Sequence, residues 1–371
     1  MEWQGKKFKE MLGQRKITQV AIASELGVSR QTVVDWINGQ VPKGSHLLGI
    51  CDRLDIDPDV LFDTSASPVQ VAPMHRQRRN AKVTPEMRQA AEELALEYAN
   101  LMDDASLPAL EMVVRESANL TPAALAAQMR ELAGLEHSHD PIGYRDTFRM
   151  VNELGICVVF RSFPEALKGY AFYTIVNGQR LVIVNSDSNL LDLIFPVLHE
   201  TVHAARNRIP KADYAKAEEA FCDQVAGLIQ FPDSYVDDVY DAIKGRPAAS
   251  QINTLKDFAR RHHHAIYGLV RRIEERHGKL NLSSQSVNGA DGNLRKECPA
   301  IKEVLVSDGA PGFVELLSEL SPIWSRIVIG NLESMTTGKL AEVLDLGILD
   351  ARAVREELHQ RGEMQACDCC V

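Results

Sequence analysis

Two histidines stand four residues apart in residues 195–203, and a glutamate directly follows the first of them. On a helix, His199 and His203 lie on one face, so that both imidazoles can bind a single metal ion. Glu200 then stands beside the metal-bound water and can accept its proton, which produces a nucleophile for amide hydrolysis near neutral pH. Pro196 requires this helix to begin within one turn before it. The alternative is a helix whose polar face merely contains the two histidines.

A second helix must bring a third protein ligand to the two histidines. Residues 218–232 have helical apolar spacing, contain two adjacent glutamates and end in a proline. We predict Glu219 as the third ligand, because Asp223 lies one turn further on the same face and can hydrogen-bond a ligand histidine. Glu218 is the competing ligand, and both glutamates are also typical of a solvated helix start. The expected ion is Zn²⁺, with Mn²⁺ as the alternative.

Residues 125–235 resemble the ImmA/IrrE family of zinc metallopeptidases. The likeness includes, in the family's order and spacing, residues 129–135, 140–142, 151–158, 163–165, 168–170 and 181–185, followed by the two helices described above. It implies a zincin-like metallopeptidase domain in which His199, His203 and Glu219 bind the metal and Glu200 is the catalytic base. Family members commonly cut repressor proteins, often in response to stress such as DNA damage. The resemblance therefore implies a repressor as the protein substrate.

Residues 18–39 contain two short apolar-periodic segments joined at Gly27, which is typical of a helix-turn-helix. In the first helix we expect Val20 to face inward. Ser29 is placed to cap the second helix, and three polar residues follow it at the N-terminal end, from which a recognition helix presents side chains to base edges in the major groove. These residues are Arg30, Gln31 and Thr32.

The same segment resembles the phage-repressor (XRE-type) helix-turn-helix family. In that family the positions that match Gln19, Arg30, Gln31 and Asp35 lie near DNA, which makes double-stranded DNA the expected partner. The net charge of the whole chain is -10, which argues against non-specific wrapping of nucleic acid. Residues 1–79, however, hold 11 Lys/Arg against 9 Asp/Glu, so the net charge of the chain does not exclude DNA docking through a local patch of this segment. The alternative is a helix-turn-helix retained for packing or for protein docking.

The length of 371 residues predicts two or three domains. We expect an α+β, mostly helical protein with a helix-turn-helix domain (1–66), a linker (67–80), a metallopeptidase domain with a small sheet (81–240) and a helical C-terminal region (241–371). Strands are predicted at 156–160 and 181–184, with a turn at Asn177-Gly178. Helices are predicted from Pro85, from Pro122, over 254–276 and over 337–361, whereas 282–293 looks irregular because Ser, Asn and Gly are frequent there.

The chain lacks an apolar run long enough to span a membrane and lacks the pattern of a secretory signal at its start. Together with the thin spread of seven cysteines, this predicts a reduced, cytoplasmic protein. Cys367, Cys369 and Cys370 cluster at the C-terminus, where a thiolate could enter the metal site, bind a separate zinc ion or sense oxidation. A frayed end is the simpler interpretation.

These patterns together predict a DNA-binding regulatory zinc metallopeptidase that cuts a peptide bond in a protein. The rival is a transcription regulator or antitoxin-like DNA-binding protein whose metal site is structural or senses a signal. A third hypothesis is self-cleavage, with the linker around residues 65–79 as the substrate. A homodimer is compatible with any of the three. One of the histidines at 262–264 could also reach the active site and stabilise an oxyanion, although a solvated or half-buried stretch in a helix is the simpler interpretation.

Overall fold

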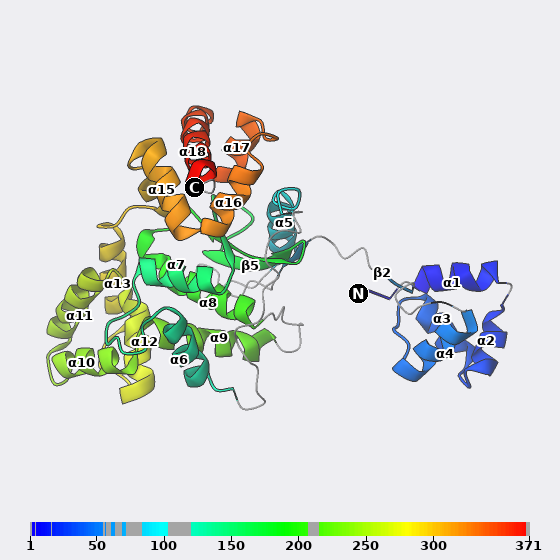
Figure 1. The fold of residues 1–371 in the computed structure, drawn as a ribbon. Coiled ribbons are helices and arrows are strands. Elements are labelled where there is room, and N and C mark those ends of the chain that lie inside the picture. The colour runs from blue at the N-terminus through cyan, green and yellow to red at the C-terminus, as the bar shows by residue number, and fades with distance from the viewer. Residues whose placement is uncertain are drawn as a thin grey trace. The chain divides into compact units, whose positions relative to one another are not determined.

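A computed structural model describes residues 2–3, 5–15, 17–54, 56, 61–63, 69–71, 84–102, 120–206 and 215–368 (Figure 1). Its contacts divide the chain into two compact units, Met1–Pro68 and Val69–Val371. The model is mostly helical and contains a small mixed sheet, which confirms the predicted α+β class. Within the described residues, every helix is too short or too polar to cross a membrane.

The first unit is a helical bundle with a two-stranded ribbon. Its elements are β1 (Glu2–Trp3), α1 (Gly5–Gln14), α2 (Gln19–Glu25), α3 (Arg30–Ile37), α4 (Gly44–Leu54) and β2 (Phe62–Asp63). Ile22, Val33 and Trp36 lie in its core. The prediction that Val20 faces inward is wrong, because Val20 is 60% exposed. Side chains two positions apart on a helix point about 200° away from each other around the axis, so Val20 faces away from the core when Ile22 is buried.

The second unit is built around a four-stranded sheet with the order β3-β5-β6-β4. Its strands are β3 (Val69–Val71), β4 (Cys157–Arg161), β5 (Ala171–Val176) and β6 (Gln179–Asn185). The β4–β6 pair is parallel, and the other two pairs are antiparallel. Asn177 and Gly178 have φ values of 48° and 79°, as the tight turn between β5 and β6 requires. The predicted turn and the two predicted strands are thus confirmed.

Both faces of this sheet are covered by helices, because side chains of alternate strand residues point to opposite faces. One face packs against α6 (Pro122–Leu132), α7 (Tyr144–Glu153), α8 (Ile194–Ala205) and α9 (Ala215–Gln230). The other face packs against α5 (Pro85–Leu96), α15 (Gly309–Leu320), α16 (Pro322–Gly330), α17 (Thr337–Leu344) and α18 (Ile348–Asp368). Figure 1 shows the two groups of helices on opposite sides of β5.

A further group of helices has a hydrophobic core of its own. It contains α10 (Asp233–Ile243), α11 (Ala248–His262), α12 (Ile266–His277) and α13 (Ser284–Arg295), and the short η2 (Leu190–Asp192) contributes Leu191 to this core. The short α14 (Ile301–Leu305) leads back to the sheet. Residues after 240 therefore contribute to all three hydrophobic cores of the second unit.

Three secondary-structure predictions in the C-terminal third are wrong. The helix predicted over 254–276 is divided at His263, and the one predicted over 337–361 is divided at Asp345, because both residues adopt a left-handed conformation that ends a helix. The stretch 282–293, predicted to be irregular, is largely helix α13. Its apolar residues pack into the core, and its Asp291 carboxylate accepts hydrogen bonds from the first backbone amides of α12 at 2.6 and 3.0 Å.

Candidate functional site

Helix α8 places the two histidines and the glutamate between the sheet and α9. It begins at Ile194, so that Pro196 lies in the first turn, as the sequence predicts and as proline geometry permits. Almost all of its residues are buried, because α8 is covered by the sheet on one side and by α9 on another. His199, Glu200 and His203 are only 1%, 6% and 1% exposed. Polar groups this deeply buried require partners within the protein or a bound ion.

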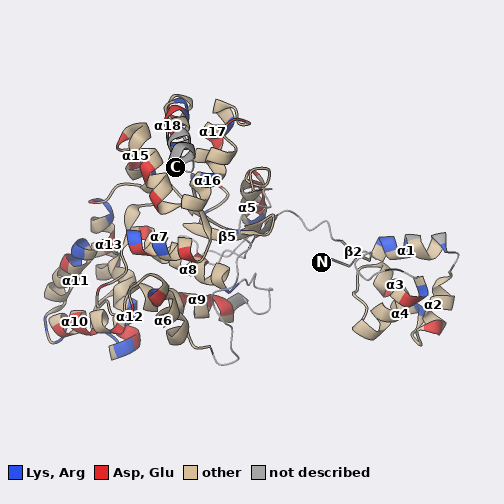
Figure 2. Cartoon of the chain, viewed as in Figure 1, with Lys and Arg blue, Asp and Glu red and all other residues tan. Residues whose placement is uncertain are grey.

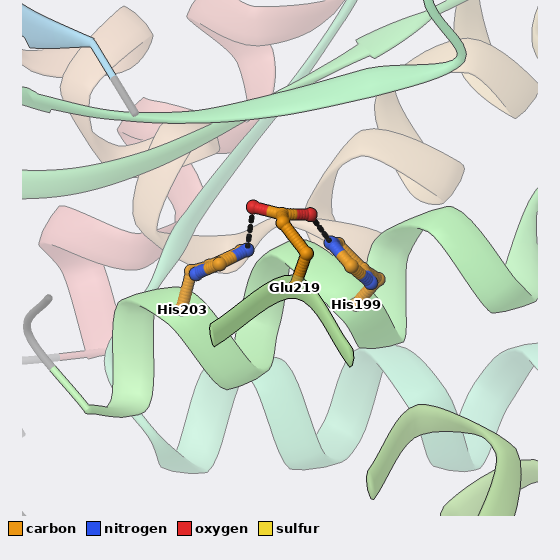
Figure 3. A group of neighbouring side chains, drawn as sticks. All are labelled: His199, His203 and Glu219. Atoms are coloured by element: carbon orange, nitrogen blue, oxygen red, sulfur yellow. Dashed lines mark hydrogen bonds and ion pairs between the residues drawn. The ribbon is translucent and has the colours of Figure 1, made fainter. Parts of the chain in front are cut away.

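Helix α9 supplies a carboxylate that lies between the two imidazoles (Figure 3). Oε2 of Glu219 is 3.0 Å from Nε2 of His199, and Oε1 is 3.2 Å from Nε2 of His203. The structure thus brings together the three residues that the sequence predicts as ligands, although 20 residues separate the first from the last. Their ligand atoms all lie within 4.8 Å of one another.

These three residues fit a tetrahedral zinc ion. With bonds of about 2.0–2.1 Å, the ligand atoms of such an ion are about 3.4 Å apart, close to the two nitrogen–oxygen distances observed here. Two neutral imidazoles and one carboxylate are also a common donor set for a zinc ion that keeps a fourth position for water or substrate. His199, His203 and Glu219 can therefore hold such an ion.

Each of the two histidines has a second partner on α9, at its other ring nitrogen. Oδ1 of Asp223 is 2.9 Å from Nδ1 of His199, in agreement with its predicted contact with a ligand histidine. Sγ of Cys222 is 3.5 Å from Nδ1 of His203. The contact of Cys222 with a ring nitrogen has no signal in the local sequence pattern. Such contacts fix the tautomer and orientation of an imidazole.

Hydrogen bonds shift the titration of the predicted ligands. Burial by itself lowers the pKa of His199, but its contacts with Asp223 and Glu219 outweigh burial and raise the pKa to about 9. Burial alone would raise the pKa of Glu219, but hydrogen bonds from His199 and His203 outweigh burial and lower the pKa to about 2. Without an ion, the site therefore favours an ionised Glu219 carboxylate beside a protonated His199 ring. A divalent cation would take the place of that proton.

Glu200 points toward the sheet. Its Oε2 accepts a hydrogen bond of 2.9 Å from the backbone N–H of Tyr173 in β5. Burial raises the pKa of Glu200, and the neighbouring His199 and His203 oppose this shift. A raised carboxylate pKa suits a group that takes and returns a proton near neutral pH. Tyr173 was not predicted from the sequence, because a backbone amide contributes no residue type to a motif.

The competing ligand candidate, Glu218, has a different neighbourhood. Its Oε1 accepts a hydrogen bond of 2.6 Å from Nη1 of Arg206, and this guanidinium lies over the ring of Phe221 at 4.2 Å. Glu218 also belongs to a second group that could hold a metal, together with His203 and Cys222. The two adjacent glutamates therefore face different partners, and only Glu219 contacts both histidines.

The other candidate residues of the C-terminal half lie elsewhere. Nε2 of His264 is 2.8 Å from the hydroxyl of Tyr235 within the core of α10–α13, and burial lowers the pKa of His264 to about 4. The rings of His262 and Tyr235 are in edge contact. Cys369 and Cys370 lie outside the described residues, as does the side chain of Cys367 at the end of α18.

The helix-turn-helix of the first unit presents most of the predicted DNA contacts at the start of α3. Oγ of Ser29 accepts a hydrogen bond of 3.0 Å from the N–H of Thr32, which confirms the predicted cap. Arg30 and Gln31 are exposed, and Gln31 donates a hydrogen bond of 3.0 Å to Asp35. Gln19 is half-buried at the start of α2.

The first unit also has exposed basic side chains on α1 (Gly5–Gln14). Figure 2 shows that α1 carries basic residues, and the exposed ones are Lys6, Lys7 and Lys9. Lysines on a small domain contact phosphates through charge and carry no sequence information. Base recognition would therefore depend on α3.

The first unit is similar to a known protein family. Residues 8–61 match the helix-turn-helix family model. None of the curated proteins that were compared matches the chain. The helix-turn-helix match, together with the exposed N-terminal end of α3, indicates a DNA-binding regulator.

Proposed function

We propose that this DNA-binding regulator is also a zinc-dependent metallopeptidase of the ImmA/IrrE type, with an XRE-type helix-turn-helix. The observation that carries the proposal is the buried group of His199, His203 and Glu219, with Glu200 one residue from the first ligand. A structural metal site does not need a buried carboxylate at this position, because the ligands alone complete it. A hydrolytic site does need one as a general base.

The roles of the protein residues follow from their contacts. A divalent ion held by the three ligands would lower the pKa of a water molecule and polarise a peptide carbonyl. Glu200 would accept a proton from that water and pass it to the leaving amine. The N–H of Tyr173 holds Oε2 of Glu200, which leaves Oε1 to carry the proton. Asp223 orients the ring of His199 through Nδ1.

The substrate we propose is a protein, and the resemblance to the ImmA/IrrE family suggests a repressor. A helix-turn-helix on the same chain would concentrate the peptidase at a DNA site where such a repressor binds. Two linked binding events raise the effective concentration of the second, so even a weak peptidase–substrate contact would suffice.

The first experiment is a metal analysis by mass spectrometry of protein purified without added metal. We expect about one zinc ion per chain in the wild type and none in a His199→Ala/His203→Ala double mutant. Zinc or manganese should then be added back once to exclude loss during purification. A wild-type protein that still binds neither ion would refute the peptidase proposal.

The second experiment is a cleavage assay against repressors encoded near the gene, with Glu200→Gln as the control. The wild type should cut one of them, and the variant should not. Intact-mass measurements on aged wild-type and Glu200→Gln protein test self-cleavage in the linker around 65–79. A cut present only in the wild type would identify the chain as its own substrate.

A non-proteolytic regulator with a structural or sensing metal site is the second candidate. The observation that favours it is the thiol of Cys222, which lies with Glu218 and His203 in a second potential ligand group. A sulfur ligand is typical of structural zinc sites. X-ray absorption of the zinc-loaded protein distinguishes the two candidates, because only the second predicts a zinc–sulfur bond of about 2.3 Å.

A further inference from the structure

One buried arginine of the second unit lacks a partner. Arg180, near the start of β6, is only 8% exposed, and among the described residues its guanidinium has neither a hydrogen bond nor an ion pair. Three other arginines are buried to the same degree and do have partners. Arg130 donates hydrogen bonds to backbone carbonyls, whereas Arg206 and Arg272 each contact a carboxylate. Because an arginine stays charged in a protein, an unpartnered buried guanidinium destabilises the fold unless a ligand supplies the anion.

The charged end of Arg180 can be reached from outside the core. Within the described part of the chain, none of its nitrogens belongs to the fully buried polar atoms that lack a partner. Since these nitrogens make no hydrogen bond, each of them retains some contact with solvent. The small exposed area of this side chain therefore includes the guanidinium, and an anion can approach it there.

The hydroxyl of Tyr173 lies near this guanidinium. Tyr173 is buried in the core on the α8 side of the sheet, and its hydroxyl has no well-oriented hydrogen bond with any described residue. Burial raises the pKa of Tyr173 to about 12, while the neighbouring charge of Arg180 opposes this rise. A phenol that is neutral at physiological pH can donate a hydrogen bond. Two buried donors are therefore neighbours, and neither has an acceptor among the described residues.

Both side chains belong to the sheet face that α8 covers. Tyr173 lies opposite Val182 in the β5–β6 register, and Arg180 is two positions before Val182 on the same strand. Side chains two positions apart on a strand point to the same face. Tyr173 and Val182 pack in the core that includes α8, so Arg180 shares their face. The backbone N–H of Tyr173 also holds Glu200, so one residue connects the predicted base to this pair of donors.

We propose that Arg180 and Tyr173 form a subsite for an acidic side chain of the substrate, an aspartate or a glutamate near the bond that is cut. A carboxylate can accept two parallel hydrogen bonds from the guanidinium and one from the phenol, and it supplies the negative charge that Arg180 lacks. This inference rests on the proposed function, because it names the substrate class of that site. An extended peptide advances about 3.3–3.6 Å per residue, so we expect the acidic residue within about three positions of the cut bond.

The first measurement is the melting temperature of the full-length protein in sodium acetate and in sodium chloride at equal ionic strength. Acetate should raise the melting temperature of the wild type, because it binds the folded state. Arg180→Met should abolish this effect, and in chloride it should melt at or above the wild type, because it removes an unpartnered charge. Arg130→Met is the matched control. It removes an equally buried arginine that has partners, so it should lower the melting temperature and keep the acetate effect.

The second measurement is cleavage of a synthetic peptide library by the zinc-loaded protein. The peptides have amidated C-termini, so that side chains provide their only carboxylates. The wild type should prefer an acidic residue at one position by roughly 10- to 100-fold, the usual value of a hydrogen bond to a charged group. Arg180→Met should lose this preference, and Arg180→Glu should replace it with a preference for lysine or arginine.

The same site preference in all three proteins, or an acetate effect that survives Arg180→Met, would overturn the proposal. So would a loss of stability in Arg180→Met as large as that in Arg130→Met. If Arg180→Met does not fold, Tyr173→Phe removes only the hydroxyl and keeps the N–H that holds Glu200, and it should reduce the acidic preference about tenfold. An acetate effect that depends on Arg180, without cleavage of any peptide, would refute only the peptidase function. Cleavage without an acidic preference would refute only the subsite.

Discussion

Oδ1 of Asp223 lies 2.9 Å from Nδ1 of His199, while Nε2 of the same ring faces Glu219. The contact holds the ring with Nε2 toward the predicted metal position. Replacing such a partner typically costs 10–100-fold in metal affinity, so we expect Asp223→Ala to weaken zinc binding by about that factor. A competition titration with a chelating dye measures the loss. Asp241→Ala, on the exposed side of α10, is the charge-matched control and should leave the affinity unchanged.

Glu219 and Glu218 provide a direct comparison of two adjacent carboxylates. We expect Glu219→Gln to lose zinc almost completely, because an amide is a poor ligand and the carboxylate contacts both histidines. Glu218→Gln should keep zinc at the wild-type stoichiometry, since Glu218 pairs with Arg206. Glu218→Gln should instead lower the melting temperature, because the buried Arg206 guanidinium loses a charged partner. Metal analysis of the two variants decides between them, and the reverse pattern would identify Glu218 as the ligand.

Glu200→Gln separates binding from chemistry. The glutamine oxygen can still accept the N–H of Tyr173, so the fold and the zinc content should be preserved. Cleavage should fall by a factor of roughly 10²–10⁴, the usual contribution of a general base. Single-turnover cleavage with excess enzyme measures this ratio. A variant that cuts at the wild-type rate would show that the proton is taken elsewhere.

DNA recognition is expected to depend on the first turn of α3. Arg30→Ala and Gln31→Ala should each weaken specific DNA binding by roughly 1–3 kcal/mol, because exposed side chains at this end reach base edges. Arg352→Ala, which removes the same charge from the exposed face of α18, is the control. Selection of operator sites from a random DNA library, followed by titration, measures these effects. Equal losses for Arg30 and Arg352 would indicate a purely non-specific charge effect.

The buried His264 makes the stability of the α10–α13 group depend on pH. Burial lowers its pKa from 6.5 to about 4, so between these values the unfolded chain binds more protons than the folded one. The free energy of unfolding should therefore fall as pH decreases from about 6.5 to 4, by about 3 kcal/mol in all, and this contribution should not fall further below pH 4. Denaturant titrations at several pH values measure the slope. His264→Gln should flatten it over this interval, and an unchanged slope would assign the effect to other groups.

Local sequence patterns were sufficient for several elements of this protein. The cap at Ser29, the helix start at Pro122, the turn at Asn177-Gly178 and the helical placement of His199 and His203 were all predicted. Each depends on residues within a few positions of one another, so the backbone preference and the spacing are visible in the sequence. The breaks at His263 and Asp345 were missed, because neither residue is a glycine, the residue type that most often takes this left-handed conformation at a helix end.

The sequence by itself determined which side chains are available for a metal site and for a DNA-binding helix. Only the tertiary structure decided that Glu219 rather than Glu218 faces both imidazoles, that Cys222 contacts His203, and that β3 ends beside the edge group that holds Glu200. The physical reason is distance along the chain. Periodicity fixes which face of a helix a residue occupies, whereas the packing of α8, α9 and the sheet fixes which of those faces meet.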